Sequence, residues 1–117
     1  MTAGRADVAL EAVVVAVTDG RPRVLTVGSA TLPRLPSGPP AAGVTLERGL
    51  RRLLEEQTGL AVGYVEQLYT FGDRGLEPDG ARKVGVAYLG LTRETRTSAS
   101  WIDVYQLFPW EDRRGTT

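Results

Sequence analysis

The sequence predicts a single α/β domain in which one amphipathic helix packs on a mixed β-sheet. The chain has 117 residues, which is enough to bury one hydrophobic core. Hydrophobic residues make up 42% of the chain and charged residues 24%, which is the balance of a globular protein. Apolar, β-branched runs lie on both sides of one segment with helical periodicity, and a helix set between strands packs on the sheet that they form.

The first two strands are expected to form a hairpin. Residues 10–17 are a nearly continuous apolar run, which is typical of a strand that is covered on both faces. A turn at residues 19–22 (Asp-Gly-Arg-Pro) separates this run from a second strand, Arg23 to Val27. Residues 28–43 contain four prolines, and this density predicts no regular element in the segment.

The clearest element is a helix from Leu46 to Gln57. Its leucines recur at the spacing that places them on one helical face: Leu46, Leu50, Leu53 and Leu54. Thr45 is suited to cap the first turn, and Gly59 is suited to end the helix in a left-handed conformation. Oppositely charged residues are spaced one turn apart on the remaining surface, as Glu47–Arg51, Arg51–Glu55 and Arg52–Glu56.

Two further strands are expected at residues 62–70 and 82–92, with a long polar loop between them. Gly85 and Ala87 make one face of the second strand shallow, so that a helix or a ligand can approach it closely. Residues 93–100 are a polar linker, and the aromatic residues of 101–110 have helical spacing and are assigned to the core or an interface. The following side chains are expected to be buried: Val14, Val15, Leu50, Leu54, Val86 and Leu89.

The composition excludes several classes of function. Basic and acidic residues each number 14, so the net charge is zero, whereas a protein that binds nucleic acid by itself normally has a basic excess. The absence of histidine and cysteine excludes a Ser-His-Asp triad, a cysteine nucleophile and thiolate zinc sites. The longest apolar stretch, residues 12–17, is too short to cross a bilayer, and no targeting signal is visible. A cytoplasmic location is therefore expected, without a membrane partner.

The segment from Gly38 to Leu60, GPPAAGVTLERGLRRLLEEQTGL, resembles a degenerate Nudix box. The Nudix signature combines conserved glycines with an arginine and several glutamates in a loop–helix–loop. The matching positions are Gly38, Arg52, Glu56 and Gly59. Three acidic positions of the signature are vacant, because Val44, Leu53 and Gln57 stand there. The resemblance implies that residues 1–117 form one Nudix-like domain, an α+β sandwich with the Nudix helix packed on a mixed sheet.

The vacant positions bear on catalysis. Hydrolysis of a diphosphate by the Nudix mechanism needs Mg²⁺, which requires several oxygen ligands. Positions 53, 56 and 57 form one patch on a helix, and only Glu56 supplies a carboxylate there. Glu55 points about 100° away from its neighbour on the helix. Hydrolysis is therefore not expected and no metal cofactor is required. The plainer interpretation of this patch is that Leu53 extends the apolar face and Arg52–Glu56 is a solvated ion pair.

The downstream sequence resembles the Nudix-related transcriptional regulators of NAD metabolism. The matching segments are EQLYTFGDRGLEPDGARKVGVAYLGL, residues 66–91, and WIDVYQLFPWEDRRG, residues 101–115, which is similar to the alphaproteobacterial branch. This resemblance implies a sensor domain that binds a nucleotide such as NAD, ADP-ribose or ATP. It also implies a homodimer, and a separate DNA-binding domain that no part of this chain resembles.

The residues that begin and follow the polar loop are candidates for the ligand site. An aromatic side chain can meet a base, and cationic side chains can meet phosphates. The candidates are Tyr69, Phe71, Asp73, Arg74, Arg82 and Lys83, and the alternative position is the proline-rich segment around Arg34 and Gly38. An ordinary surface hairpin would explain the same loop composition.

Two other functions are compatible with the sequence. One is a Nudix hydrolase of a nucleoside diphosphate derivative such as ADP-ribose, in which Glu56 would bind Mg²⁺ together with Glu66 or Glu77. The other is an interaction domain that binds no small ligand.

Overall fold

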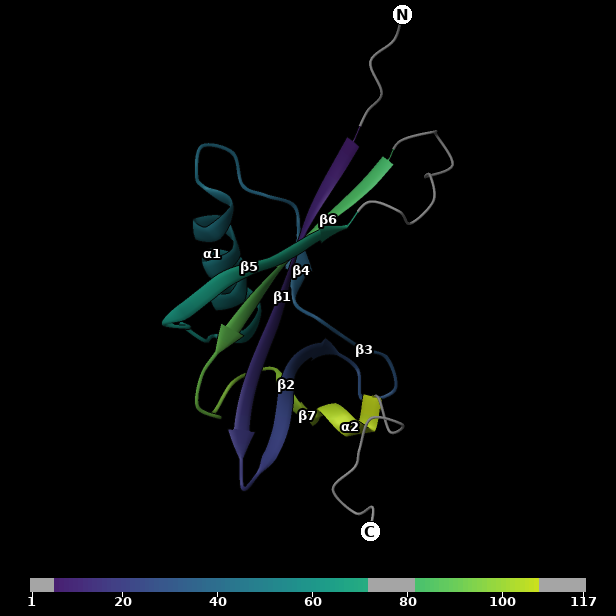
Figure 1. The fold of residues 1–117 in the computed structure, drawn as a ribbon, viewed down its shortest axis with the longest axis vertical. Helices are drawn as coiled ribbons and strands as arrows, with labels where there is room; N and C mark the ends of the chain where they lie inside the picture. The colour runs from purple at the N-terminus through teal and green to yellow at the C-terminus, as the bar shows by residue number, and fades with distance from the viewer. Residues whose placement is uncertain (1–5, 72–81, 108–117) are drawn as a thin grey trace, which may run out of the picture.

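The computed structural model describes residues 6–71 and 82–107 (Figure 1). Its elements, in chain order, are β1 (Ala6–Thr18), β2 (Arg21–Gly28), β3 (Pro33–Arg34), β4 (Ser37–Gly38), α1 (Leu46–Thr58), β5 (Tyr64–Phe71), β6 (Arg82–Leu91), β7 (Ser100–Asp103) and α2 (Val104–Leu107). The predicted class, a mixed sheet with one amphipathic helix packed on it, is confirmed. Neither helix in these two ranges has the length and apolar character that would let it cross a membrane.

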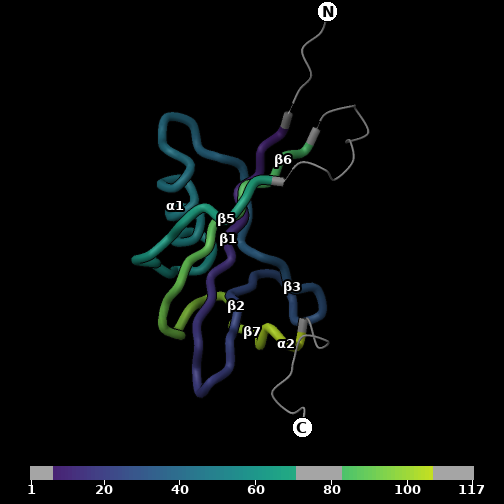
Figure 2. Tube along the Cα trace, in the orientation of Figure 1, coloured from purple at the N-terminus to yellow at the C-terminus, as the bar shows by residue number. Residues whose placement is uncertain are grey.

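The sheet is built around β1, which is paired along both of its edges (Figures 1 and 2). The strand order is β3-β2-β1-β6-β5, and β4 pairs with β1 while β7 pairs with β2. One edge of β1 runs parallel to β6, with partners from Ala6↔Arg82 to Val15↔Leu91. The other edge pairs antiparallel with β4 and then with β2. The sheet therefore combines parallel and antiparallel pairs.

The hairpin between β1 and β2 has a tighter turn than the sequence predicts. Asp19 and Gly20 both have positive φ, 52° and 73°, which is the geometry of a two-residue turn that matches the twist of the strands. The second strand therefore begins at Arg21, and Pro22 pairs with Val17 inside the hairpin.

Helix α1 forms as its sequence predicts. The Thr45 hydroxyl accepts a hydrogen bond from the Arg48 amide at 3.2 Å, which caps the first turn. Gly59 has a φ of 73°, and its amide donates to the Glu55 carbonyl to close the last turn. Of the four leucines expected on the apolar face, Leu50, Leu53 and Leu54 are buried, whereas Leu46 is exposed.

The two faces of the sheet are covered differently. The helix face is the one that contacts α1, and its core side chains include Leu10, Ala12, Val14, Val86 and Tyr88, which are buried together with Leu50 and Leu54. The open face is the opposite one, because side chains alternate along each strand. By register it presents Val13, Val15, Leu89, Leu91 and Tyr64. Burial is confirmed for Val14, Leu50, Leu54 and Val86, whereas Val15 and Leu89 on the open face are only half-buried.

Two sequence-based expectations are wrong. The segment 28–43 contains two short strands, because Pro33 begins a strand that pairs only with the edge of β2, where a missing amide hydrogen costs no ladder bond. The start of the aromatic tail is not helical, since Trp101 lies in β7 and pairs with Leu25. The helix α2 begins only at Val104. Trp101 packs against the core as predicted, and residues 108–110 lie outside the described ranges.

Candidate functional site

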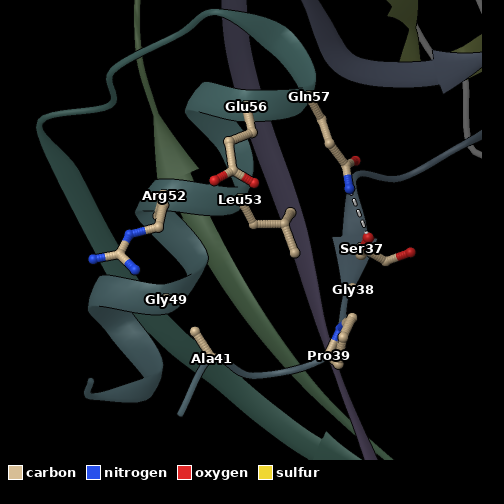
Figure 3. A pocket seen from close by; sticks show the side chains of 9 residues that line it. All are labelled: Ser37, Gly38, Pro39, Ala41, Gly49, Arg52, Leu53, Glu56 and Gln57. Atoms are coloured by element: carbon tan, nitrogen blue, oxygen red, sulfur yellow. Dashed lines mark hydrogen bonds between the residues drawn. The ribbon is translucent and has the colours of Figure 1, made fainter. Parts of the chain in front are cut away.

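A shallow pocket of about 390 Å³ lies between α1 and the chain around β4 (Figure 3). The side chains and backbone that line it belong to Ser37, Gly38, Pro39, Ala41, Gly49, Arg52, Leu53, Glu56 and Gln57. This set contains three of the four box residues identified in the sequence, and the fourth, Gly59, caps the helix that carries them. The segment that resembles a Nudix box therefore folds into one loop–helix unit with a pocket on its surface.

Leu53 occupies the wall of this pocket where the Nudix signature has a glutamate. It is 8% exposed, and its Cδ1 atom would lie 2.6 Å from a Cβ atom added at Gly38. Gly38 is held in the sheet by its pairing with Leu10 on β1. A Cβ atom at position 38 would therefore force the end of the Leu53 side chain to shift. This apolar contact puts carbon at a position where a metal site would need oxygen.

Gln57 joins α1 to β4 through its amide. The Nε2 atom donates a hydrogen bond to the Ser37 carbonyl at 2.8 Å, a contact that joins the helix to the short strand (Figure 3). The Oε1 atom of the same side chain is buried and has no hydrogen-bond partner within the described residues. A glutamate at this position would present only acceptors to a carbonyl when ionised. The amide at position 57 thus supports a structural contact that an ionised glutamate cannot make.

The two charged residues of the pocket point outward. Arg52 and Glu56 are both exposed, and Figure 3 shows the guanidinium directed away from the Glu56 carboxylate. No ion pair joins them in the described part of the chain, so the expected Arg52–Glu56 pair is wrong, whereas the expected Glu47–Arg51 pair is present at 3.5 Å. Glu56 is thus a single carboxylate at the rim of the pocket.

Polar contacts hold the C-terminal end of α1 in place. The fully buried Thr58 donates through its hydroxyl to the Leu54 carbonyl at 2.6 Å and accepts from the Leu60 amide at 3.2 Å. Arg51 donates to the backbone carbonyls of Val62 and Gly63. The helix surface that forms the pocket is consequently anchored to the chain that follows it.

Among the described residues that line the pocket, Glu56 supplies the one carboxylate available to a magnesium ion. Within residues 6–71 and 82–107, no group of three or more acidic side chains is arranged to hold a metal ion. Glu66, proposed as a second ligand beside Glu56, pairs in register with Leu89 and therefore lies on the open face, opposite α1. Glu77 lies outside the described residues.

The predicted ligand residues fall at two distant places. Tyr69 pairs with Ala87 after a bulge in β5, and Lys83 lies four residues before Ala87 on β6. Side chains alternate along a strand, so the exposed side chains of Tyr69 and Lys83 both lie on the open face. Arg34 is on β3 at the opposite edge of the sheet, so the structure does not bring it together with them. For Phe71 and Arg82 the structure describes the backbone, at the end of β5 and the start of β6, and Asp73 and Arg74 lie outside the described residues.

Two tyrosines of the β5–β6 pair have perturbed acidity. A hydrogen bond from the Tyr64 hydroxyl to Glu66 at 2.5 Å, together with the charge of that carboxylate, raises the pKa of Tyr64 above its ordinary value. Burial raises the pKa of Tyr88, and the negative charge of Glu47 adds to the effect. Both phenols are therefore neutral and able to donate hydrogen bonds at neutral pH.

Solved structures share the fold of this chain. No protein-family model and no curated protein matches the sequence. The Nudix domain of Shewanella oneidensis NrtR, solved with ADP-ribose, has a TM-score of 0.73 and 25% identity, over 93% of this chain and 79% of that one. NrtR bound to a 27mer DNA has a TM-score of 0.69 and 24% identity, over 86% of this chain and 52% of that one. The Ap4A hydrolase of C. elegans has a TM-score of 0.66 and 14% identity, over 89% of this chain and 85% of that one.

The chain therefore has the Nudix fold, as the box and downstream resemblances imply. It spans about half of the DNA-bound NrtR chain. Its structural neighbours include both NrtR, which was solved with ADP-ribose and with DNA, and a hydrolase.

Sequence reasoning missed part of the pocket lining. Ser37 contributes through its backbone carbonyl, which any residue could supply, so the sequence holds no signal for it. Gly49 did carry a signal, because a glycine in the middle of an amphipathic helix is unfavourable unless something approaches closely. A Cβ atom at this position would lie 3.6 Å from the Ala41 amide nitrogen, which is an ordinary van der Waals contact, so the chain before α1 lies against Gly49 without requiring a glycine there.

Proposed function

We propose that this chain is a ligand-sensing Nudix domain that binds an NAD-related nucleotide and does not hydrolyse it. The observation that carries the proposal is the pocket beside α1, where Leu53 packs on Gly38 and Gln57 bonds to Ser37. These contacts use two positions that an active Nudix enzyme needs for carboxylates. A single rim carboxylate, Glu56, cannot neutralise a diphosphate through bound metal.

ADP-ribose is the first ligand to test. The fold matches the NrtR Nudix domain that was solved with this molecule, over 93% of the present chain. NAD and ATP share its adenosine diphosphate part and are the other candidates. Recognition of the phosphates by cationic side chains alone requires no metal cofactor. The proposal includes a role as the sensor part of a transcriptional regulator of NAD metabolism, a homodimeric state, a cytoplasmic location and a DNA-binding domain outside this sequence.

We propose that the ligand binds at the end of β5 and the start of β6. Tyr69 and Lys83 lie on the same sheet face, and Lys83 is four positions from Ala87, the partner of Tyr69. This separation corresponds to about 13 Å along a strand, which an extended ADP-ribose molecule can cover from base to phosphates. Arg82 and Arg74 are the other cations proposed to meet the phosphates or ribose, with Phe71 or Tyr69 near the base, and Asp73 is also among the proposed ligand residues.

Isothermal titration calorimetry with matched variants tests this placement. A charge-assisted contact is worth about 1.5–3 kcal/mol, so Lys83→Ala and Arg82→Ala should each weaken ADP-ribose binding about tenfold or more. Arg34→Ala removes an equal charge at the opposite edge and should leave the affinity unchanged. If Arg34→Ala weakens binding and the other two variants do not, the ligand lies in the proline-rich segment near Gly38 instead.

The hydrolase alternative rests on the shared fold of solved hydrolases, among them a C. elegans Ap4A hydrolase. It requires acidic ligands that residues 6–71 and 82–107 do not assemble.

A further inference from the structure

Glu11 is the one charged residue in an otherwise apolar stretch of β1. Along the chain, the nearest charged residues on either side of it are Asp7 and Asp19. The strand that carries Glu11 is paired along both of its edges. A carboxylate in such a strand costs free energy unless a hydrogen-bond donor or a cation replaces part of its hydration. The sheet thus carries a charge where packing alone favours an apolar side chain.

The Glu11 carboxylate has no partner among the residues that the structure describes. Its side chain lies on the open face, because Leu10 and Ala12 on either side of it belong to the core beneath α1. The residue is half-buried, and within residues 6–71 and 82–107 no hydrogen bond or ion pair engages its carboxylate. Another carboxylate of this face, Glu66, accepts a hydrogen bond from the Tyr64 hydroxyl. Glu11 therefore retains its capacity to accept hydrogen bonds from a bound molecule.

The registers place Glu11 in a row that crosses four neighbouring strands, β4, β1, β6 and β5 (Figure 1). Its partners are Ser37 on one side and Ala87 on the other, and Tyr69 follows opposite Ala87. Ala87 contributes only a methyl group and is 3% exposed, whereas Tyr69 is 59% exposed. Two strand spacings, about 10 Å, thus separate an exposed aromatic residue from the carboxylate, with no long side chain between them.

We propose that Glu11 recognises the hydroxyl groups of the ribose that is attached to the base of the bound nucleotide. A carboxylate accepts hydrogen bonds and ribose hydroxyls donate them, as in dinucleotide sites where an acidic residue binds the ribose 2′-hydroxyl. The hydroxyl of Ser37 adds a neutral group that can donate or accept beside the carboxylate. Tyr69 is the residue proposed to lie near the base, so Glu11 is at the end of the site where the adjoining sugar lies.

The chemistry of this row disfavours a phosphate as its occupant. A carboxylate repels a phosphate, and Lys83, the cation of the proposed site, lies four residues from Ala87, or about 13 Å along β6. The same repulsion would act on a phosphate attached to the 2′-oxygen. Glu11 is therefore a specificity-determining residue, which favours nucleotides with a free 2′-hydroxyl over their 2′-phosphorylated forms.

This inference rests on the proposed function, because it assigns a role within the same nucleotide site. Calorimetric titration with ADP-ribose, and with an analogue that lacks the 2′-hydroxyl of the adenosine ribose, tests it. The wild type should bind ADP-ribose about tenfold more tightly than the analogue. Glu11→Ala should weaken ADP-ribose binding about tenfold and should bind the two ligands equally. Loss of a negative charge would by itself strengthen the binding of an anionic ligand, so weaker binding identifies a direct contact.

Glu66→Ala is the matched control, because it removes a carboxylate from the adjacent row of the same face. This variant should bind ADP-ribose no more weakly than the wild type and should keep the preference over the analogue. Glu11→Gln keeps the size of the side chain and provides the test if Glu11→Ala is not folded. A neutral acceptor makes a weaker hydrogen bond than a carboxylate, so the expected loss is about threefold.

Thermal unfolding distinguishes a binding role from a structural one. The carboxylate of Glu11 has no partner within the described ranges, so both variants should unfold at the wild-type temperature or above it. The inference would be overturned, with the proposed function left standing, if the wild type bound both ligands equally. The same conclusion would follow if a folded Glu11 variant bound ADP-ribose as tightly as the wild type does. A wild type that binds no nucleotide would overturn both.

Discussion

The two faces of the sheet differ in how far their side chains contact other residues or are exposed to solvent. On the helix face, Leu53 packs on Gly38 and Gln57 bonds to Ser37, so the residues of the Nudix-like box contact one another. On the open face, Tyr69, Lys83 and Leu91 are exposed. The box residues therefore contribute to packing in this structure, whereas side chains of the open face are exposed to solvent.

The largest contrast between the faces is expected in stability. Leu54→Ala removes a side chain that is 1% exposed beneath α1 and should lower the free energy of unfolding by about 2–5 kcal/mol. Leu91→Ala removes the same side chain from a site that is half exposed and should cost about 1 kcal/mol or less in the monomer. Urea denaturation at low protein concentration measures both. Equal losses would mean that the two faces are covered alike.

The amide of Gln57 provides a sharper test of the structural role of the box. Gln57→Glu replaces the donor to the Ser37 carbonyl by a carboxylate and should lower the free energy of unfolding by about 1–3 kcal/mol at neutral pH. Protonation of the new carboxyl restores a donor, so the loss should shrink as the pH falls. Gln67→Glu is the control on exposed β5 and should change stability by about 0.5 kcal/mol or less. Equal effects at both positions would contradict the structural role of the amide.

The smallest effect concerns the glycine of the box. Gly38→Ala brings a Cβ atom to 2.6 Å from Leu53 Cδ1, and since the end of a leucine side chain can shift, the cost should be about 1 kcal/mol. In a Leu53→Ala background the same change should cost nothing. A double-mutant cycle in urea measures this coupling, and additive effects of the two changes would show that Leu53 does not pack on Gly38.

Periodicity predicted the helix face well, because a single amphipathic helix and its caps are local properties. The ends of α1 lie within one residue of their predicted positions, and its buried leucines are those of the apolar stripe, Leu46 excepted. Leu46 lies in the first turn of the helix, where the leucine spacing carries no information about whether the sheet still lies beneath it.

The site was less predictable because it depends on strand order and on a bulge. Arg34 and Lys83 are both cations near loops in the sequence, but they lie on β3 and β6, which β2 and β1 separate in a sheet whose order the sequence does not reveal. The bulge between Gln67 and Tyr69 moves Tyr69 to the open face, opposite the side that an unbroken alternation would give. The Gly38–Leu53 contact joins residues from two elements and likewise has no local signature.

The central claim is that this Nudix fold binds ADP-ribose without cleaving it. The most direct measurement is an ADP-ribose hydrolysis assay with Mg²⁺ or Mn²⁺, run beside calorimetric titrations of NAD, ADP-ribose and ATP with and without metal. The account predicts saturable binding of at least one nucleotide, with product formation no faster than in a protein-free control. Metal-dependent hydrolysis that Glu56→Gln abolishes would show an active hydrolase and would contradict the claim. The claim would also be contradicted if none of the three nucleotides bound.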